Sequence, residues 1–358
     1  MSFSSKGWFE FSTERQYPTY KWMELARSAD YLCRKILGIV PGENVVIYAD
    51  TATDPRVVQA TSAAAHNIGA KVTVLWYETK GDIDLPPPEP VEAAVMAANM
   101  VIEFAVAYLV HSAMWAKARE KGIDLKCLTG MNADMMIRTI DPDLEGKMAE
   151  FGAAYRDIVM AGKKTGRVAN AAGTDFTYKF FTPEELEEMV KTRPPQKRGG
   201  MLGGQGGLNA NPATINGKIV VDGAFWPPSE LGLLRKPIEM TCKDGRIEVV
   251  SDHHEARVAK NWFAHFRDDR VYSVLHVSTG FNPGVKRLTG DIVEDERLFG
   301  CVEFGVGRAT PTLPCHTDCI LVNPSIWIDG KLIEKDGIFV EPKLKKLAKE
   351  LGMQLWVD

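Results

Sequence analysis

Short runs of β-branched and apolar residues alternate with longer stretches of helical periodicity from about residue 20 to residue 161. Four of the short runs predict buried parallel strands, namely VVIYA (45–49), VTVLW (72–76), VIEFA (101–105) and LKCLT (125–129). Between the first two runs, apolar residues recur at helical spacing over residues 55–68, with Asp54 suited to the N-cap and Gly69 just past the end. The pattern predicts a layered α/β structure with at least one βαβ unit.

The second half of the chain has a different pattern. Its predicted strands alternate apolar and polar residues, and turn dipeptides recur at Asn216-Gly217, Asp222-Gly223, Asp244-Gly245 and Asp329-Gly330. We therefore predict an α/β protein with two domains: a Rossmann-like parallel-sheet domain over residues 1–162 and a mainly antiparallel β (α+β) domain over residues 163–358. The Gly- and Pro-rich stretch 193–211 precedes a predicted strand, which favours an ordered loop near a site.

Composition and charge narrow the function classes. The 358 residues carry a net charge of -4 without a run of five like charges, so neither a nucleic acid nor an anionic membrane is expected as partner. The chain has no apolar stretch of about 18 residues, and its start lacks the features of a signal peptide. We expect a cytoplasmic protein with a small-molecule substrate and with its six cysteines reduced.

The loop after the first predicted strand argues against a dinucleotide. It contains no glycine between Asp50 and Pro55, so its backbone cannot close on a pyrophosphate, and the carboxylates of Asp50 and Asp54 would repel one.

Several of the seven histidines have ordinary structural explanations. His66 and His265 fall near predicted helix ends, where a polar or charged side chain is favourable. His253 and His254 are adjacent, and neighbours on a helix point about 100° apart, so they are poorly arranged to share a metal ion.

The segment around His316 is different. Residues two apart on a strand share a face, so His316 and Asp318 should project together while Cys315, Thr317 and Cys319 point the other way. A structural hydrogen bond between His316 and Asp318 explains this motif as well as a metal site does. With His276 from another predicted strand, however, two histidines and one aspartate form the facial triad that holds non-haem Fe(II) and leaves coordination positions open.

Glu303 lies on a predicted strand between these two histidine segments. A fourth metal ligand, a general base and an outward-facing residue are all open interpretations of this carboxylate.

The order of three C-terminal segments resembles a known family. VSTGFNPG, EDERLFGCVEFGVG and PCHTDCI follow one another as in the C-terminal half of the M29 aminopeptidases. Within that fold, the arrangement looks closest to 2,5-dihydroxypyridine 5,6-dioxygenase, an iron-dependent ring-opening enzyme. The resemblance extends over residues 40–335 and includes LVHS (109–112), AGTDF (172–176) and the histidine ahead of the G-x-N-P turn.

This resemblance implies roles for particular residues. It makes His276, His316 and Asp318 the ligands of one Fe(II) ion. It makes His111 a base that deprotonates a ring hydroxyl, a task for which neutral imidazole is suited. We further expect Val110, Ser112 and Gln205 in the substrate site and Glu303 in the active site.

Two positions depart from these families. Gln205 stands where the peptidases place a metal-bridging glutamate, and a neutral amide is a poor bridge between two dications. Glu303 stands where the dioxygenase pattern leads us to expect an apolar residue, so the substrate or the reaction can differ.

Three functions are therefore considered. The first is a mononuclear Fe(II) dioxygenase that opens a hydroxylated aromatic or N-heterocyclic ring with O2. The alternative is a metallohydrolase in which Zn(II) or Mn(II) activates water and Glu303 accepts its proton. The third is a binding protein with a vestigial site. A homo-oligomer is also expected, with the N-terminal segment GWFEF as a candidate contact.

Overall fold

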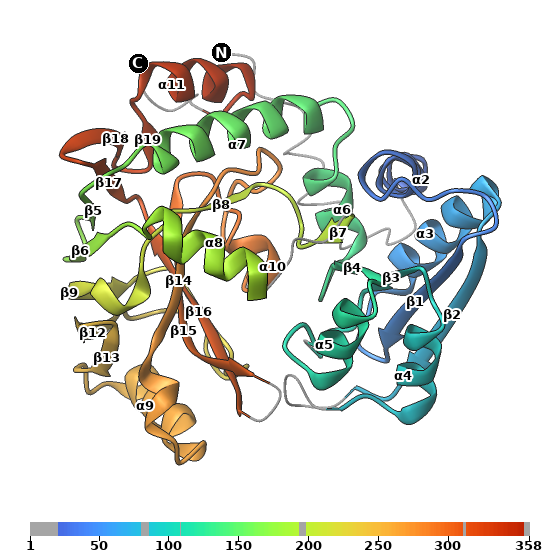
Figure 1. The fold of residues 1–358 in the computed structure, drawn as a ribbon, viewed down its shortest axis with the longest axis horizontal. Helices are drawn as coiled ribbons and strands as arrows, with labels where there is room; N and C mark the ends of the chain where they lie inside the picture. Colours follow the sequence, from blue (N-terminus) through green and yellow to red (C-terminus); the bar gives the residue numbers. More distant parts are fainter. Residues whose placement is uncertain (1–20, 80–85, 108, 193–197, 311–312, 354–358) are drawn as a thin grey trace. The chain divides into compact units, whose positions relative to one another are not determined.

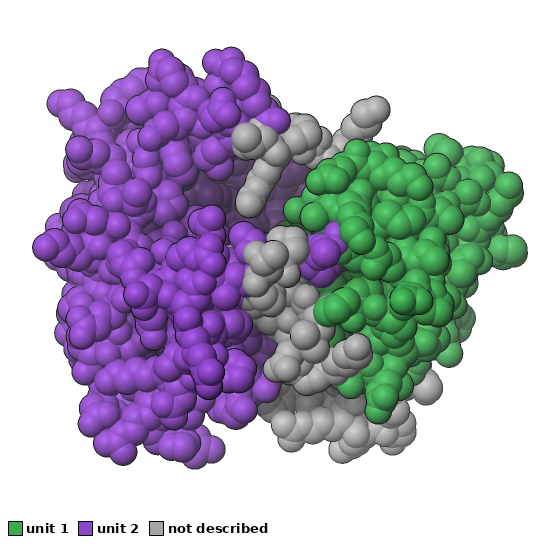
Figure 2. Space-filling view, turned by 60° about the horizontal axis from the view of Figure 1, so that its bottom comes forward, with its two compact units in different colours: residues 1–110, 114–142, 196–201 green, residues 111–113, 143–195, 202–358 purple. Residues whose placement is uncertain are grey.

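The structure is a computed structural model that describes residues 21–79, 86–107, 109–192, 198–310 and 313–353 (Figure 1). The segment GWFEF, on which the expected oligomer contact rests, lies outside these residues, as do residues 193–197 of the Gly- and Pro-rich loop. The chain forms two compact units, made of Met1–Val110, Met114–Pro142 and Gln196–Met201, and of His111–Ala113, Asp143–Pro195 and Leu202–Asp358 (Figure 2). The boundary expected after residue 162 stays a prediction.

The first unit is a parallel α/β structure, as the sequence predicts. Among the described residues its sheet has the strand order β2-β1-β3-β4-β7, and all four pairings are parallel. Its elements are α2 (Trp22–Tyr31), η1 (Leu32–Ile36), β1 (Asn44–Asp50), α3 (Pro55–Ile68), β2 (Lys71–Tyr77), α4 (Glu89–Met96), β3 (Met100–Glu103), α5 (Ala113–Glu120), β4 (Asp124–Cys127), α6 (Ala133–Thr139) and β7 (Gly199–Gly200).

Local sequence signals set the limits of α3. The Asp54 side chain accepts a hydrogen bond from the backbone N–H of Arg56, and Pro55 begins the helix. Gly69 ends it with a φ of 97°, in the left-handed region that glycine adopts without strain. The predicted βαβ unit is confirmed with these bounds.

Burial follows the prediction for three of the four strands. β1 is buried at six of its seven positions, and β3 is buried throughout. The expectation of a buried strand is wrong for β2, where Val74 and Trp76 are 37% and 45% exposed. Among the described residues, β2 pairs with β1 alone and forms an edge of the sheet, where a strand has one neighbour and not two.

The glycine-free loop after β1 uses its two carboxylates internally. Asp50 is buried and accepts hydrogen bonds from the backbone N–H groups of Ala52 and Ala107, at 3.2 and 3.0 Å. Asp54 accepts from the N–H of Ala133 at 2.9 Å. These carboxylates engage backbone amides in this loop and in two neighbouring segments.

The second unit is mainly antiparallel, as expected. Its described strands form two sheets, ordered β11-β10-β16-β15-β14-β8 and β13-β12-β9-β6-β5-β17-β18-β19. Its elements are α7 (Glu145–Met160), β5 (Thr165–Ala169), β6 (Asp175–Lys179), α8 (Pro183–Thr192), β8 (Gln205–Gly207), η2 (Pro212–Thr214), β9 (Asn216–Val221), β10 (Ala224–Trp226), β11 (Gly232–Leu233), β12 (Ile238–Lys243), β13 (Arg246–Val249), α9 (His254–His265), η3 (Asp269–Tyr272), β14 (Val274–Gly280), α10 (Ile292–Asp295), β15 (Cys301–Thr310), β16 (Leu313–Val322), β17 (Ser325–Ile328), β18 (Lys331–Lys335), β19 (Ile338–Phe339) and α11 (Pro342–Glu350).

Two of the four predicted turn dipeptides form hairpins, and Asp222-Gly223 lies between β9 and β10, which belong to different sheets. Asp244-Gly245 and Asp329-Gly330 join adjacent antiparallel strands with positive φ at both residues. The predicted turn at Asn216-Gly217 is wrong, because these residues begin β9. A Cβ on Gly217 would lie 2.3 Å from the backbone oxygen of Asp175 on the neighbouring strand. Glycine is needed there for close strand approach rather than for a turn.

Aromatic side chains fill the core of the second unit. Phe151 of α7 lies 5.1 Å from Phe281 and 5.0 Å from Phe339, measured between ring centroids. All six cysteines are buried free thiols, as expected. In the part of the chain that the structure describes, no helix has the length and apolar character needed to cross a membrane.

Candidate metal centre

Two strands of the second unit, β14 and β16, carry the predicted metal ligands, and β15 lies between them. β15 pairs with β14 on one side and with β16 on the other, both antiparallel (Figure 1). Gly305 of β15 lies opposite His276 of β14 and also opposite Asp318 of β16. The side chains of His276 and Asp318 therefore flank a glycine on the same face of the sheet.

Strand alternation separates this polar face from the core. Val277, Phe304 and Cys319 occupy the intervening positions of the three strands and are buried in the hydrophobic core. The prediction that His316 and Asp318 share a face opposite to Cys315 and Cys319 follows the same period of two.

A local irregularity in β14 sets the orientation of the His276 side chain. The register between β14 and β15 shifts between Val274 and His276, which marks a β-bulge at the site. The imidazole of His276 then lies over Gly305, where a Cβ would come within 2.4 Å of ring atoms Cε1 and Nε2. The bulge and the glycine together make room for the ring above the sheet.

The three predicted ligands converge. Nε2 of His276 lies 3.4 Å from Nε2 of His316 and 3.7 Å from Oδ1 of Asp318. Nε2 of His316 lies 3.1 Å from the same Oδ1 atom. One ligand atom from each residue therefore faces a shared point, and His316 and Asp318 are buried.

The donor set suits a divalent cation. Two imidazole nitrogens and one carboxylate oxygen are the ligands of the facial triad that binds non-haem iron. Oδ1 of Asp318 is buried and accepts no hydrogen bond among the described residues. A buried carboxylate oxygen in that state needs a compensating charge, and a cation bonded at about 2 Å to each ligand would supply it.

Electrostatics agrees with this arrangement. Although 43% of the His276 side chain is exposed, desolvation by the surrounding atoms and the nearby His316 lower its pKa to about 4. Burial opposes ionisation of Asp318, but His316 and His276 outweigh it and hold the Asp318 pKa below its usual range. A neutral imidazole and an ionised carboxylate are the states that bind a metal.

Glu303 contacts the far side of the His276 ring. Its Oε1 lies 3.1 Å from Nδ1 of His276, and its side chain is fully buried. Burial, together with the carboxylates of Asp318 and Glu296, raises the pKa of Glu303 well above its ordinary value. Two hydrogen-bond donors, Ser278 Oγ and Gln205 Nε2, contact its Oε2 atom.

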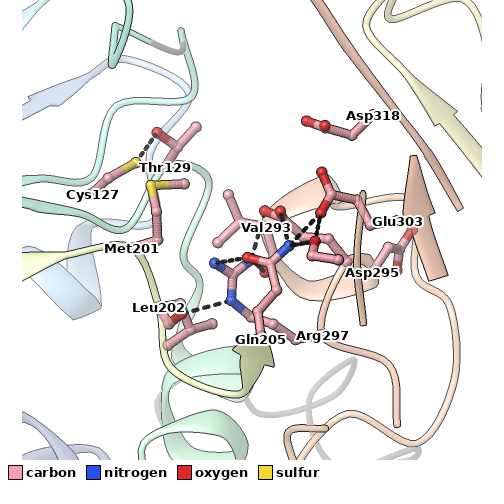
Figure 3. Close-up of polar contacts among 12 residues, drawn as sticks. Cys127, Thr129, Met201, Leu202, Gln205, Val293, Asp295, Arg297, Glu303 and Asp318 are labelled. Atoms are coloured by element: carbon pink, nitrogen blue, oxygen red, sulfur yellow. Dashed lines mark hydrogen bonds and ion pairs between the residues drawn. The ribbon is translucent and has the colours of Figure 1, made fainter. Parts of the chain in front are cut away.

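Gln205 links this carboxylate to a buried ion pair. Its Nε2 donates to Glu303 Oε2 at 2.6 Å and to Glu296 Oε2 at 2.8 Å. Arg297, which is fully buried, pairs with Glu296 at 2.6 Å and reaches Gln205 Oε1 at 3.4 Å. Figure 3 shows Gln205 between the guanidinium of Arg297 and the carboxylate of Glu303.

A second group of possible ligands, made of three carboxylates, shares Asp318 with the group of His276, His316 and Asp318. Glu296, Glu303 and Asp318 also bring ligand oxygens within 4.8 Å of one another. The amide nitrogen of Gln205, however, bonds to both glutamates and fills the space between them. The neutral amide of Gln205 therefore donates hydrogen bonds to both Glu296 and Glu303.

His111 lies beside His316, one of the predicted metal ligands. Its ring centroid is 5.0 Å from that of His316, in an edge-to-face arrangement. Ser112 is buried in the same unit, and Val110 is buried in the first unit. The substrate-binding roles of Val110 and Ser112 stay predictions.

The remaining histidines lie elsewhere. His66 and His265 are exposed in the last turns of α3 and α9, and His254 is exposed at the start of α9. His253 approaches the backbone oxygen of Pro237 at 2.8 Å. Among the described residues, none of them belongs to a group that could hold a metal ion.

Sequence reasoning missed four residues of the site: Ser278, Glu296, Arg297 and Gly305. Alternation along β14 and β15 places Ser278 with His276, and Gly305 with Glu303, so period-two counting could have found the first and last. Nothing in the local pattern marks Glu296 or Arg297, which follow the short helix α10.

Solved structures define the class of fold. AmpT from Thermus thermophilus, an M29 aminopeptidase, matches with a TM-score of 0.60 and 12% identity, covering 90% of this chain and all of that one. The 2,5-dihydroxypyridine dioxygenase of Pseudomonas putida KT2440 matches with a TM-score of 0.67 and 17% identity, covering 90% of this chain and 99% of that one. The fold is thus M29 aminopeptidase-like, as predicted.

Sequence comparison narrows the class to a family. Residues 22–341 match the family of 2,5-dihydroxypyridine 5,6-dioxygenase, and the chain belongs to this family. The 2,5-dihydroxypyridine 5,6-dioxygenase of Pseudomonas putida (strain KT2440) is 22% identical over 329 residues, which cover 84% of this chain and 92% of that protein.

Proposed function

We propose that this chain is a mononuclear non-haem Fe(II) dioxygenase that opens a hydroxylated N-heterocyclic ring of the 2,5-dihydroxypyridine type with O2. Membership of the dioxygenase family supports the reaction class. The convergence of His276, His316 and Asp318 on one point carries the metal assignment, because this donor set leaves coordination positions for two further ligands.

These three residues would hold the iron through His276 Nε2, His316 Nε2 and Asp318 Oδ1. Fe(II) bound there supplies the one-electron chemistry that allows triplet dioxygen to react with a closed-shell ring. The neutral imidazole of His276 and the ionised carboxylate of Asp318 keep these two donor atoms available near neutral pH.

His111 is proposed as the base. Its ring lies 5.0 Å from His316, which brings it to the edge of the metal centre without making it a ligand. By accepting a proton from a ring hydroxyl it would make the substrate more electron-rich before oxygen attack. Gln205 is proposed to act through Glu303, since its amide is engaged by that carboxylate and by Glu296.

The metallohydrolase alternative needs a carboxylate free to take a proton from water. Glu303 contacts Ser278 and Gln205 through one oxygen and His276 through the other, which disfavours that task. The cytoplasmic location and the homo-oligomeric state stay proposals.

The test compares oxygen uptake and metal content. Protein purified without oxygen is loaded with Fe(II), Zn(II) or Mn(II) and assayed with 2,5-dihydroxypyridine in an oxygen electrode. The proposal expects one iron per chain and oxygen consumption matched to loss of the ring. Hydrolysis of amides or peptides under nitrogen by the Zn(II) or Mn(II) form would instead support the hydrolase.

A further inference from the structure

We infer that Glu303 is a positioning residue of the proposed metal centre: its carboxylate, 3.1 Å from Nδ1 of His276, is placed to accept a hydrogen bond from Nδ1–H when the ring binds a cation through its unprotonated Nε2. The inference rests on the proposed metal centre and deepens it. It assigns Glu303 the role of orienting the proposed ligand His276, in place of proton transfer with substrate or water.

The first support is the geometry of the ring. Nδ1 of His276 lies 3.1 Å from Glu303 Oε1, while Nε2 of the same ring lies 3.4 and 3.7 Å from the other two ligand atoms. The two nitrogens of one imidazole thus face a carboxylate and the metal point respectively. Glu303 Oε1 is buried and makes no hydrogen bond among the described residues, and Nδ1 of His276 lies at ion-pair distance from it.

The second support is that Glu303 is held in place. Its Oε2 accepts hydrogen bonds from Ser278 Oγ and from Gln205 Nε2. Gln205 is fixed in turn by Arg297, whose guanidinium donates to Gln205 Oε1, to the backbone oxygen of Leu202 and to that of Val293. Both donors at Oε2 need an acceptor, so the Glu303 carboxylate turns its other oxygen toward His276.

The chemistry follows from the tautomer. A neutral imidazole carries one proton, and only the unprotonated nitrogen can bind a metal. A carboxylate at Nδ1 fixes the proton there, orients the ring and raises its basicity toward the metal. A bound cation also favours the ionised form of Glu303, against the effect of burial.

Two substitutions separate this role from mere space filling. In E303Q, the donors Ser278 and Gln205 keep the amide oxygen on their side, so the new NH2 group faces Nδ1 of His276. Nδ1 must then accept a hydrogen bond from the amide, so the imidazole proton moves to Nε2. A protonated Nε2 has no lone pair with which to bind a metal. E303A removes the carboxylate, and the His276 ring can then carry its proton on either nitrogen.

We therefore expect E303Q to bind metal more weakly than E303A, although glutamine has nearly the shape of glutamate. Both variants should lose about 10- to 100-fold in affinity relative to the parent. Affinity is measured by competition of Zn(II) and Fe(II), without oxygen, against a coloured chelator. A residue that only fills space gives the opposite order, with E303Q close to the parent.

The control is Glu334, a fully buried carboxylate on β18 with no hydrogen bond among the described residues. E334Q replaces another buried glutamate of the same unit by its neutral isostere and should bind metal as the parent does. H316A removes a ligand and should lose the metal. If the parent itself binds no divalent metal, the proposed function fails. If the parent and H316A behave as expected while E303Q binds like the parent, only the inference on Glu303 fails.

A measurement on the parent protein needs no variant. The His276 side chain is 43% exposed, so an unprotected Nδ1–H would exchange rapidly with water. In the Zn(II) form with 15N-labelled histidine, we expect a slowly exchanging Nδ1–H resonance from His276, and its loss in E303A. Rapid exchange in the parent overturns the inference.

Discussion

Gly305 provides a direct test of how the proposed metal centre is built. An alanine there would place its Cβ 2.4 Å from Cε1 and Nε2 of His276 and 2.8 Å from Nδ1. Ordinary van der Waals contact begins near 3.4 Å, so the ring must retreat by about 1 Å. The ring is partly exposed and sits at the end of a side chain, and it can yield more easily than the sheet.

The expected result is a loss of metal binding with little loss of stability. Ligand distances tolerate shifts of only about 0.2 Å, and a displacement of about 1 Å removes His276 from the coordination sphere. We expect G305A to bind metal at least about 100-fold more weakly, which is the upper range for loss of a group that merely supports a ligand. Its free energy of unfolding should fall by less than about 1 kcal/mol, below the usual range for overpacking a rigid core.

The assay pairs metal competition with thermal unfolding of the metal-free protein. Gly207 on β8 of the same sheet is the matched control, because a Cβ there would meet nothing within 4 Å. G207A should resemble the parent in both measurements. Unchanged metal affinity in G305A would falsify the claim that the metal-bound His276 ring lies over this glycine.

Three further outcomes are expected. H111A should keep its iron but turn over about 10²- to 10⁴-fold more slowly, as shown by metal content and oxygen uptake, whereas loss of iron would make His111 a ligand. Burial raises the pKa of Glu334 well above its ordinary 4.5, so the folded state binds more protons and the free energy of unfolding should fall as pH rises above 4.5. Denaturant titrations across that range should show a smaller fall in E334Q, and equal falls would contradict the burial argument. D54A removes the α3 cap and the acceptor of the Ala133 N–H, so it should lower stability by at least about 1 kcal/mol, and an unchanged midpoint in denaturant would refute this.

The parallel sheet was predictable because its signals are local. The apolar run of β1, the cap at Asp54 and the left-handed Gly69 each act within a few residues. The exposure of β2 was not predictable, because its sequence is as apolar as that of a central strand. Position at a sheet edge depends on strand order, which local periodicity does not encode.

The candidate metal ligands were predictable in part for a related reason. His316 and Asp318 are two residues apart, and strand periodicity alone places them on one face. His276 and Glu303 required the strand order β14, β15 and β16 and the register between them. The contact of Gln205 with Glu303 required β8 to pair with β14, which lies about 70 residues further along the chain.

The charge of the site explains why one extra carboxylate matters. Glu296, Glu303 and Asp318 crowd together, and burial is the largest cause that raises the pKa of the two glutamates. Arg297 compensates Glu296 through a direct ion pair. The remaining two carboxylates would match the charge of one divalent cation held by His276, His316 and Asp318, as proposed. Under the proposed function, replacing Glu303 by a neutral residue leaves that cation with excess positive charge, so tighter binding of anionic ligands such as azide should accompany the weaker metal binding. Azide titrations of E303A and of the parent, each saturated with Fe(II), measure this directly, and equal azide affinities would show that Glu303 does not share its charge with the metal.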